Sequence, residues 1–440
     1  MRPPAAAHVG AALRVVAQRL GGTWVKAGQL VASIPDLVVT ELADELRPLL
    51  DTAPPVPLGV VRRIVEKALD RPFRSAFTDI DPLPVGTGSL AVVHRGVTTA
   101  GRTVALKVLR PGIERNSAAD LVLIERLIGQ LASWGGIGRR PVTFVVDSLR
   151  EQLGAELDLR EEARAMARFS ALFRDAGLTR VTVPDVLEDL TARRVLTMEF
   201  IEGVAVDDLS AIEQRGLDPR PLIDEAVRAW WTTTAVEGVF HGDVHAGNLL
   251  LTTDGRLGLI DWGIVGTLDP ATLRLMRLLV SGAAGEEASF ELAAAALVDQ
   301  MPDRARRRSG LDDDQLRAMA GRALSYALTR PYGEVSLGSL LTGEALGEGA
   351  VADRSLSPRR AAAGLPGRRS ARARGQRRGG PAPVEEGTVD EGGLDRTLFL
   401  LGKQLLYFER YGKRYLADRP ILGDTASITR LLEGREAGDP

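Results

Sequence analysis

Apolar residues recur at helical spacing along the first part of the chain. The segments AALRVVAQRL, LVVTELADELRPLL and VPLGVVRRIVEKAL repeat apolar positions three and four residues apart, which predicts amphipathic helices. Pro35, Pro54, Pro55 and Pro57 separate these segments. We therefore expect a helical extension over residues 1–80, ahead of the first strand.

A pattern of strands begins after Pro84. An alternating apolar segment from Leu90 to Val97 and a second one, Val104–Val108, predict two antiparallel strands joined by a short turn. Such a hairpin can place backbone N–H groups over nucleotide phosphates, and Lys107 on the second strand would add a positive charge. A lysine on an ordinary strand surface is the alternative. The turn residues expected near the phosphates are Gly86, Thr87, Gly88 and Ser89.

Helical spacing returns after Pro111 and, beyond a glycine-rich break, runs from Val142 to Ala176. This second stretch is rich in acidic residues, and a charged helix face is usually just solvated. In a kinase-like small lobe, however, a helix glutamate pairs with the strand lysine. Glu162 is our candidate for a pair with Lys107.

Two further strands are predicted between Val181 and Glu202. The segment Arg194–Gly203 passes from apolar to acidic residues and ends in glycine. This pattern suits a hinge whose backbone at Glu199 would receive an adenine ring, and it equally suits a core strand that ends in a turn. We expect residues 81–203 to form the smaller of two lobes.

The stretch VFHGDVHAGNLLLTTDGRLGLIDWG, residues 239–263, carries the clearest chemistry. Phosphoryl transfer needs a carboxylate beside the attacking hydroxyl or water, and metal ligands that neutralise the phosphates. Asp243 fits the first role, and Asn248 and Asp261 fit the second. A kinase catalytic loop has this Asp-to-Asn spacing and places an Asp-x-Gly turn after a hairpin. The alternative is a β-hairpin with ordinary turn residues at Asp254-Gly255.

Composition limits the remaining possibilities. The 440 residues suffice for two or three domains, and a formal net charge of -2 argues against a dedicated nucleic-acid binder. The absence of cysteine excludes disulfides, thiolate catalysis and cysteine-ligated zinc. No apolar run reaches the length of a membrane span, and no signal peptide is recognised at the start. We expect a cytoplasmic protein and leave peripheral membrane contact open.

The last part of the chain changes composition twice. Helical patterns continue to about Leu341, so residues 204–342 are expected to form the larger lobe. Residues 343–393 are rich in arginine, glycine and proline, which predicts a disordered insertion. A basic arm for anionic lipid or nucleic acid, and a local reading-frame artefact, are the alternatives. A helical segment is expected over residues 394–440.

Four motifs, in this order along the chain, resemble those of the UbiB/AarF family of atypical protein-kinase-like proteins. Lys26-Ala27-Gly28-Gln29 resembles the KxGQ signature of that family, and Glu156-Leu157-Asp158 resembles its ExD motif. The catalytic loop is His241-Gly242-Asp243-Val244-His245-Ala246-Gly247-Asn248, and Asp261-Trp262-Gly263 stands where kinases have Asp-Phe-Gly. The resemblance covers roughly residues 20–340 and extends to the segment LLGKQLLYFERY.

The resemblance implies an α+β, two-lobed protein-kinase-like fold whose helical N-terminal extension lies over the active site. It implies ATP and Mg²⁺ as cofactors, and a role in isoprenoid quinone or lipid metabolism through ATP hydrolysis or phosphoryl transfer. Quinone precursors, anionic lipid and proteins of quinone biosynthesis are the implied partners. The implied roles are catalysis by Asp243, magnesium binding by Asn248 and Asp261, an ion pair between Lys107 and Glu162, and regulation by Lys26, Gln29, Glu156 and Asp158.

Two features depart from the family pattern. The nucleotide loop, Gly86–Ser89, is closer to that of ordinary kinases than to the alanine-rich loop common in the family, and no transmembrane segment is present where many relatives have one. The alternatives are a small-molecule phosphotransferase of the aminoglycoside or choline kinase type and a nucleotide-binding pseudokinase scaffold. The KxGQ motif favours the UbiB type over the first, and the complete set of site residues argues against the second.

Overall fold

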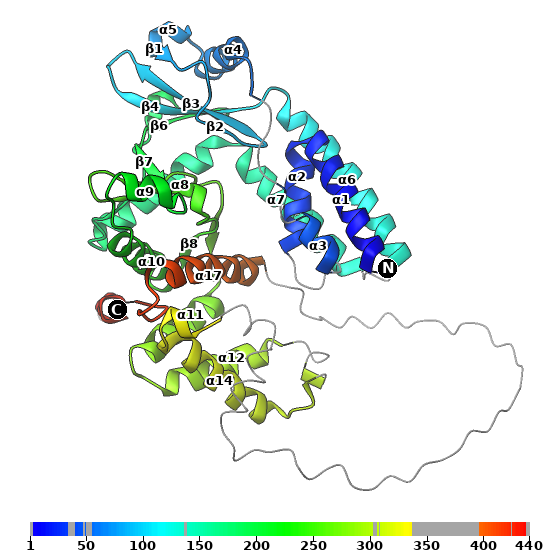
Figure 1. Ribbon diagram of the computed structural model, residues 1–440, viewed down its shortest axis with the longest axis vertical. Helices are drawn as coiled ribbons and strands as arrows, with labels where there is room; N and C mark the ends of the chain where they lie inside the picture. Colours follow the sequence, from blue (N-terminus) through cyan, green and yellow to red (C-terminus); the bar gives the residue numbers. More distant parts are fainter. Residues whose placement is uncertain are drawn as a thin grey trace, which may run out of the picture.

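The computed structural model has a strand-rich lobe next to a mainly helical lobe, with the N-terminal helices packed beside them (Figure 1). Helices occur together with mainly antiparallel sheets, which confirms the predicted α+β class. The arginine-rich segment 343–393, for which we predicted disorder, lies outside the described residues. The structure describes residues 3–33, 40–46, 49, 55–135, 139–301, 306–307, 309–336, 396–423 and 425–436.

The sheet of the smaller lobe has the order β1-β3-β4-β6, and β2 pairs with β3. Along β4, Leu106 packs into a core with α4, whereas Ala105 and Leu109 face the core that contains α8. Lys107 therefore lies on the α8 face, because side chains alternate along a strand. The bounds are α4 (Leu58–Leu69), α5 (Phe73–Ala76), β1 (Phe77–Ile80), β2 (Gly86–Thr87), β3 (Ala91–Thr98), β4 (Thr103–Leu109), η1 (Glu188–Leu190), β6 (Val195–Glu199) and α8 (Leu159–Asp175).

The first strand begins earlier than predicted. We expected strands only after Pro84, but β1 starts at Phe77, and α4 packs on β4 and β6. Residues 58–80 thus pack with the sheet and not as part of a purely helical extension. The four residues of β1 are buried, exposed, exposed and buried in turn, so the period-two criterion does not detect this strand.

The N-terminal helices α1 (Pro3–Leu20), α2 (Gly22–Ser33) and α3 (Thr40–Leu46) pack on one another, and α2 also contacts α6 (Ile113–Gly135) and α7 (Arg139–Glu156) (Figure 1). Gly28 on α2 allows this packing. A Cβ atom at Gly28 would lie 2.3 Å from Cδ1 of buried Leu49, so a larger residue would push the helix away.

The helical stretch predicted over 142–176 is two helices, α7 and α8. The chain leaves α7 after Glu156, and Asp158 has an extended backbone with φ of -128°. Its side chain accepts the N–H of Arg160 at 3.1 Å and so caps α8. An aspartate at the N-cap, directly before α8, explains why the break falls here, although the helical spacing of apolar residues continues across it.

The larger lobe combines helices with two small sheets, one ordered β5-β10-β9-β7 and one pairing β8 with β11. The hairpin expected ahead of the Asp-Trp-Gly turn, with its turn at Asp254-Gly255, is present: β9 and β10 pair antiparallel around a turn in which Gly255 has φ of +79°. The bounds are β5 (Val181–Thr182), β7 (Gly203–Ala205), α9 (Leu209–Gln214), α10 (Arg220–Ala235), β8 (Val239–His241), η2 (Ala246–Asn248), β9 (Leu249–Thr252), β10 (Leu257–Leu259), β11 (Val265–Thr267), α11 (Pro270–Ala283), α12 (Ala288–Asp299), α14 (Asp313–Thr329) and η3 (Tyr332–Glu334).

The C-terminal helices return to the larger lobe. Helix α17 (Arg396–Tyr415) packs on α10 near β8 and β11 (orange in Figure 1), and α18 (Thr425–Glu436) contacts α10 and α11. The rings of Trp230 on α10 and Phe408 on α17 lie 5.5 Å apart. Among the helices that the structure describes, none has the length and apolar character needed to cross a membrane.

Candidate functional site

His241 connects the catalytic loop to the Asp-Trp-Gly turn. Its Nδ1 accepts the backbone N–H of Asp243 at 3.0 Å, and its Nε2 lies 2.6 Å from the carbonyl oxygen of Asp261. The carbonyl can only accept, so the ring carries its proton on Nε2 and is neutral. Burial lowers the pKa of His241 and favours this form. The two motifs, 20 residues apart, are therefore held in one geometry.

Lys107 joins the sheet, α8 and the Asp-Trp-Gly turn. Its Nζ lies 2.8 Å from Oε1 of Glu162 and 3.1 Å from Oδ2 of Asp261. Burial favours the neutral amine, but the two carboxylates outweigh burial and raise the pKa of Lys107 well above its ordinary value. Glu162 also accepts the N–H of Trp262 at 3.2 Å. The ion pair that we expected between Lys107 and Glu162 is thus present, and it extends to Asp261.

Asp243 is paired with a lysine from the end of the chain. Oδ1 of Asp243 lies 2.8 Å from Nζ of Lys403 on α17, and Oδ2 lies 3.9 Å from Nε2 of His245. Burial alone would raise the pKa of Asp243, but Lys403 and His245 hold it below its usual value. Asn248 donates from Nδ2 to the carbonyl oxygen of Asp243 at 2.9 Å and closes the loop.

Helix α17 also binds the backbone of the catalytic loop. Fully buried Gln404 accepts the N–H of Val244 at 2.9 Å and donates to the carbonyl oxygen of Gly242 at 2.5 Å. The hydroxyl of Tyr411 donates to the carbonyl oxygen of Val244 at 3.0 Å. We call Lys403, Gln404 and Tyr411 the α17 clasp.

The three residues of the α17 clasp were not among the predicted site residues. The segment RTLFLLGKQLLYFERY places Lys403 and Gln404 among apolar residues at helical spacing. Polar residues on a helix face that packs into a core need partners, and this was the available signal. The partners lie 160 residues earlier in the chain, and no local pattern identifies them.

The KxGQ and ExD motifs meet through Lys26 and Glu156. Nζ of Lys26 lies 2.8 Å from Oε2 of Glu156, whose Oε1 also accepts from Gln152 at 3.0 Å. A Cβ atom at Gly263 would lie 3.6 Å from Cγ of Glu156, so this pair lies on the Asp-Trp-Gly turn. The N-terminal helix α2 therefore reaches the site.

The other two predicted regulatory residues bind elsewhere. Gln29 donates to the carbonyl oxygen of Leu49 at 3.0 Å. Asp158 pairs with the guanidinium of Arg160, with Oδ2 2.6 Å from Nη2, in addition to capping α8. Arg160 lowers the pKa of Asp158 through these bonds. Of the ExD acids, the structure thus brings Glu156 to Lys26, while Asp158 bonds within its own helix.

The predicted nucleotide loop is a short hairpin. Gly86 and Thr87 form β2 opposite β3, and the carbonyl oxygen of Gly88 accepts from Nε of Arg110 at 2.9 Å. Ser89 is buried. Glu199 ends β6, and its N–H donates to the carbonyl oxygen of Asp185 at 2.8 Å. In this conformation an adenine ring at the predicted hinge could not use the N–H of Glu199.

The groups proposed for magnesium are oxygen donors. Asn248 commits its amide nitrogen to Asp243, so its Oδ1 is the atom that a cation would use. Asp261 is a carboxylate whose pKa lies far below its usual value, because Lys107 outweighs the effect of burial. In the described part of the chain, no group of three or more His, Cys, Asp or Glu could hold a metal. Two oxygen ligands suit Mg²⁺, which takes its other ligands from water and phosphate.

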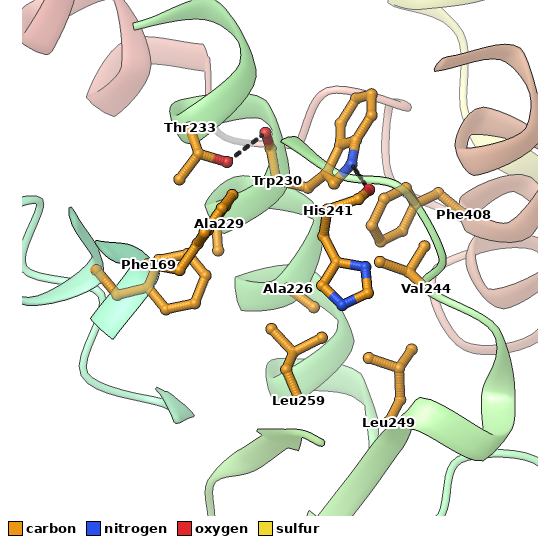
Figure 2. Close-up of a pocket in the computed structure, with 11 residues that line it drawn as sticks. Phe169, Ala226, Ala229, Trp230, Thr233, His241, Val244, Leu249, Leu259 and Phe408 are labelled. Carbon is orange, nitrogen blue, oxygen red and sulfur yellow. Dashed lines mark hydrogen bonds between the residues drawn. The ribbon is translucent and has the colours of Figure 1, made fainter. Parts of the chain in front are cut away.

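A small cavity lies behind the catalytic loop, between α8, α10 and α17. Its volume is about 20 Å³, and Phe169, Trp230, His241 and Phe408 are among its lining residues (Figure 2). Nε1 of Trp230 donates to the carbonyl oxygen of His241 at 3.2 Å. A cavity of this size holds about one water molecule, so it is a packing feature and not a substrate pocket.

Comparison with known proteins bears on the family of this chain. The sequence model of the ABC1 atypical kinase-like domain matches residues 48–290. An uncharacterized, chloroplastic aarF domain-containing protein kinase of Arabidopsis thaliana is 37% identical over 292 residues, which are 65% of this chain and 53% of that protein. A probable protein kinase UbiB of Marinobacter nauticus is 35% identical over 267 residues, 59% of this chain and 48% of that protein.

A solved structure of a Mycobacterium tuberculosis protein in complex with erythromycin matches with 30% sequence identity and a TM-score of 0.42, over 61% of this chain and 68% of that chain. The chain spans about half the length of the curated relatives that it matches. The family model and the sequence relatives do not favour the small-molecule phosphotransferases that we considered. Because the domain match covers more than half of the 440 residues, this chain belongs to the ABC1 family of atypical kinase-like proteins.

Proposed function

We propose that this chain binds ATP with Mg²⁺ between its two lobes and transfers or hydrolyses the γ-phosphate at Asp243. The observation that carries the proposal is the arrangement around Asp261, which faces Lys107 of the smaller lobe and is tied through His241 to the loop that holds Asp243. Phosphoryl transfer depends mainly on positioning and on charge that stabilises the transition state. The site has both.

Each residue has a chemical role in this proposal. Lys107, held by Glu162, would bind the phosphates through its ammonium group. Asp243 would accept a hydrogen bond from the attacking water or hydroxyl and take up its proton. Asn248 and Asp261 would hold magnesium, which when bound neutralises the charge of the β- and γ-phosphates.

The proposed acceptor is water or a small molecule, and not a protein side chain. The resemblance implies that the N-terminal helices occupy space that a protein substrate would need, and the position of the Lys26–Glu156 pair on the Asp-Trp-Gly turn supports this. The resemblance to the UbiB/AarF family points to phenolic quinone precursors or anionic lipids as the molecules that activate turnover.

The test is ADP release by the purified chain with MgATP, with and without anionic liposomes and a phenolic quinone precursor. We expect turnover that these additions stimulate, and a loss of about 10²-fold or more in Asp243→Asn. Asp254→Asn, in the exposed hairpin turn, is the matched control because Asp254 bonds to Thr252 and Arg256 within its own hairpin. Nucleotide binding with no turnover under any condition would instead favour a pseudokinase scaffold.

A further inference from the structure

The catalytic loop has a deficit of positive charge. Between His241 and Asn248 the sequence HGDVHAGN contains no lysine or arginine. In phosphoryl transfer, negative charge spreads over the three outer oxygens of the transferred group, and cations stabilise it. If the proposed function is right, which is the premise of this inference, the cation beside Asp243 must come from another part of the fold.

Lys403 lies in that position. Its Nζ is 2.8 Å from Oδ1 of Asp243, the carboxylate at which the nucleophile would bind. The Lys403 side chain is 28% exposed and that of Asp243 is 23% exposed, so a ligand can reach both. An ammonium group has three donors, and Lys403 can therefore bind a phosphate oxygen while it stays next to Asp243.

Two lysines contact the acidic residues of the site. Burial favours the neutral amine of Lys403, but Asp243 outweighs burial and raises its pKa, while the positive charge of Lys26 lowers it. Lys107 on β4 contacts Asp261 directly, at 3.1 Å. Positively charged groups from α17 and β4 therefore lie beside Asp243 and Asp261, the two acids between which the γ-phosphate would bind.

The position of Lys403 is fixed by its neighbour in the sequence. Gln404 binds the backbone on both sides of Asp243, through Gly242 and Val244. Tyr411, two helical turns later, binds Val244 again. Helix α17 and the catalytic loop thus form one rigid unit, and a side chain held in this way is preorganised for binding.

We propose that Lys403 is a catalytic residue that binds the γ-phosphate of ATP beside Asp243, so that α17 completes the phosphoryl-transfer site. In the reaction, the oxygen of water or of an acceptor hydroxyl forms a bond to the γ-phosphorus. The bond from that phosphorus to the bridging oxygen breaks, and ADP leaves with the electron pair. Asp243 takes the proton of the nucleophile. Lys403 keeps its charge throughout and stabilises the transferred group.

The test compares the dissociation constants of a non-hydrolysable ATP analogue and of ADP, each with Mg²⁺, by titration calorimetry on the full chain. A contact to the γ-phosphate predicts that Lys403→Met weakens binding of the ATP analogue about tenfold or more and leaves ADP binding within about twofold. Lys403→Arg, which keeps the charge, should retain part of the preference for the analogue. Lys413→Met is the matched control on the same helix, because Lys413 pairs with Glu409 away from the loop.

A purely structural Lys403 must be distinguished from one that binds phosphate. Loss of Lys403 leaves Asp243 unpaired, and its charge alone would repel the γ-phosphate. Lys403→Met is therefore repeated in the Asp243→Asn background, where that repulsion is absent. A selective loss of analogue binding in this background supports direct contact, and an unchanged ratio of the two constants overturns it. If Lys403→Met does not fold, Lys403→Gln, which can still donate to Asp243, gives the same comparison.

The outcomes separate this inference from the proposed function. Wild-type protein that binds neither nucleotide would overturn both. Wild-type protein that binds the analogue, with equal losses of analogue and ADP affinity in Lys403→Met, overturns only the role of Lys403. If nucleotide binds but is not turned over, the ratio of the dissociation constants of the ATP analogue and ADP still tests the role of Lys403, because binding requires no phosphoryl transfer.

Discussion

Replacement of Gln404 by leucine tests whether α17 fixes the geometry of the catalytic loop. Gln404 is fully buried and makes two hydrogen bonds to the loop backbone, to Val244 and Gly242. Leucine has a similar volume, so the change removes the two bonds with little loss of packing. It leaves one N–H and one carbonyl group of the loop without these partners.

The expected magnitude follows from those two groups. A buried backbone group that loses its partner costs about 1–3 kcal/mol. Two such groups give about 2–6 kcal/mol, and relaxation of the loop or entry of water offsets part of this. We expect the free energy of unfolding to fall by about 2–4 kcal/mol. Because small misplacements of reacting groups can cost about 10²-fold in rate, turnover should fall at least tenfold.

The assay is urea unfolding of Gln404→Leu beside wild type, followed by ATP turnover at a temperature where both are folded. Gln214→Leu is the matched control, because Gln214 lies on the exposed side of α9 and bonds to Ser210 within its own helix. If Gln404→Leu has the same unfolding free energy and the same turnover rate as wild type, the α17 clasp does not fix the geometry of the catalytic loop. A change in stability with normal turnover would mean that α17 supports the fold but not the loop geometry.

Three further predictions concern the site itself. Lys107→Met should weaken MgATP binding about tenfold or more, measured by calorimetry; affinity equal to wild type would contradict a phosphate contact. Lys26→Met removes the ion-pair partner of Glu156, which is part-buried, so we expect lower stability by about 1–3 kcal/mol together with changed ATP affinity or phosphate incorporation into the chain; unchanged affinity and no incorporation would count against a restraining role. In the presence of Mg²⁺, ATP at about 100 times its dissociation constant should stabilise the folded chain by about 2.7 kcal/mol. Asp261→Asn should abolish this gain. Equal stabilisation without Mg²⁺ would show that the metal is not needed for ATP binding.

The sequence predicted those parts of the site that lie on contiguous, patterned segments. The β9–β10 hairpin follows from two apolar runs around Asp254-Gly255. The ion pair of Lys107 with Glu162 was expected and is present, since alternation fixes the face of β4 and helical period fixes the face of α8. What these residues do with a nucleotide remains a prediction.

Other features were not predictable, for physical reasons. Strand β1 has four residues, too few for an alternating pattern to be recognised. The break at Asp158 interrupts no apolar period, and its signal is a capping side chain. The partnership of Lys403 and Asp243 spans 160 residues. Helical period identifies the buried face of α17, but it does not identify the loop against which that face packs.

The most direct test of the central claim is MgATP turnover by the full chain beside Asp243→Asn, with anionic liposomes and a phenolic quinone precursor present. The claim is that the loop of Asp243, the turn of Asp261 and Lys107 form a working phosphoryl-transfer site. This account predicts ADP release by the wild type and a loss of about 10²-fold or more in the variant. Equal rates in the two proteins would contradict it.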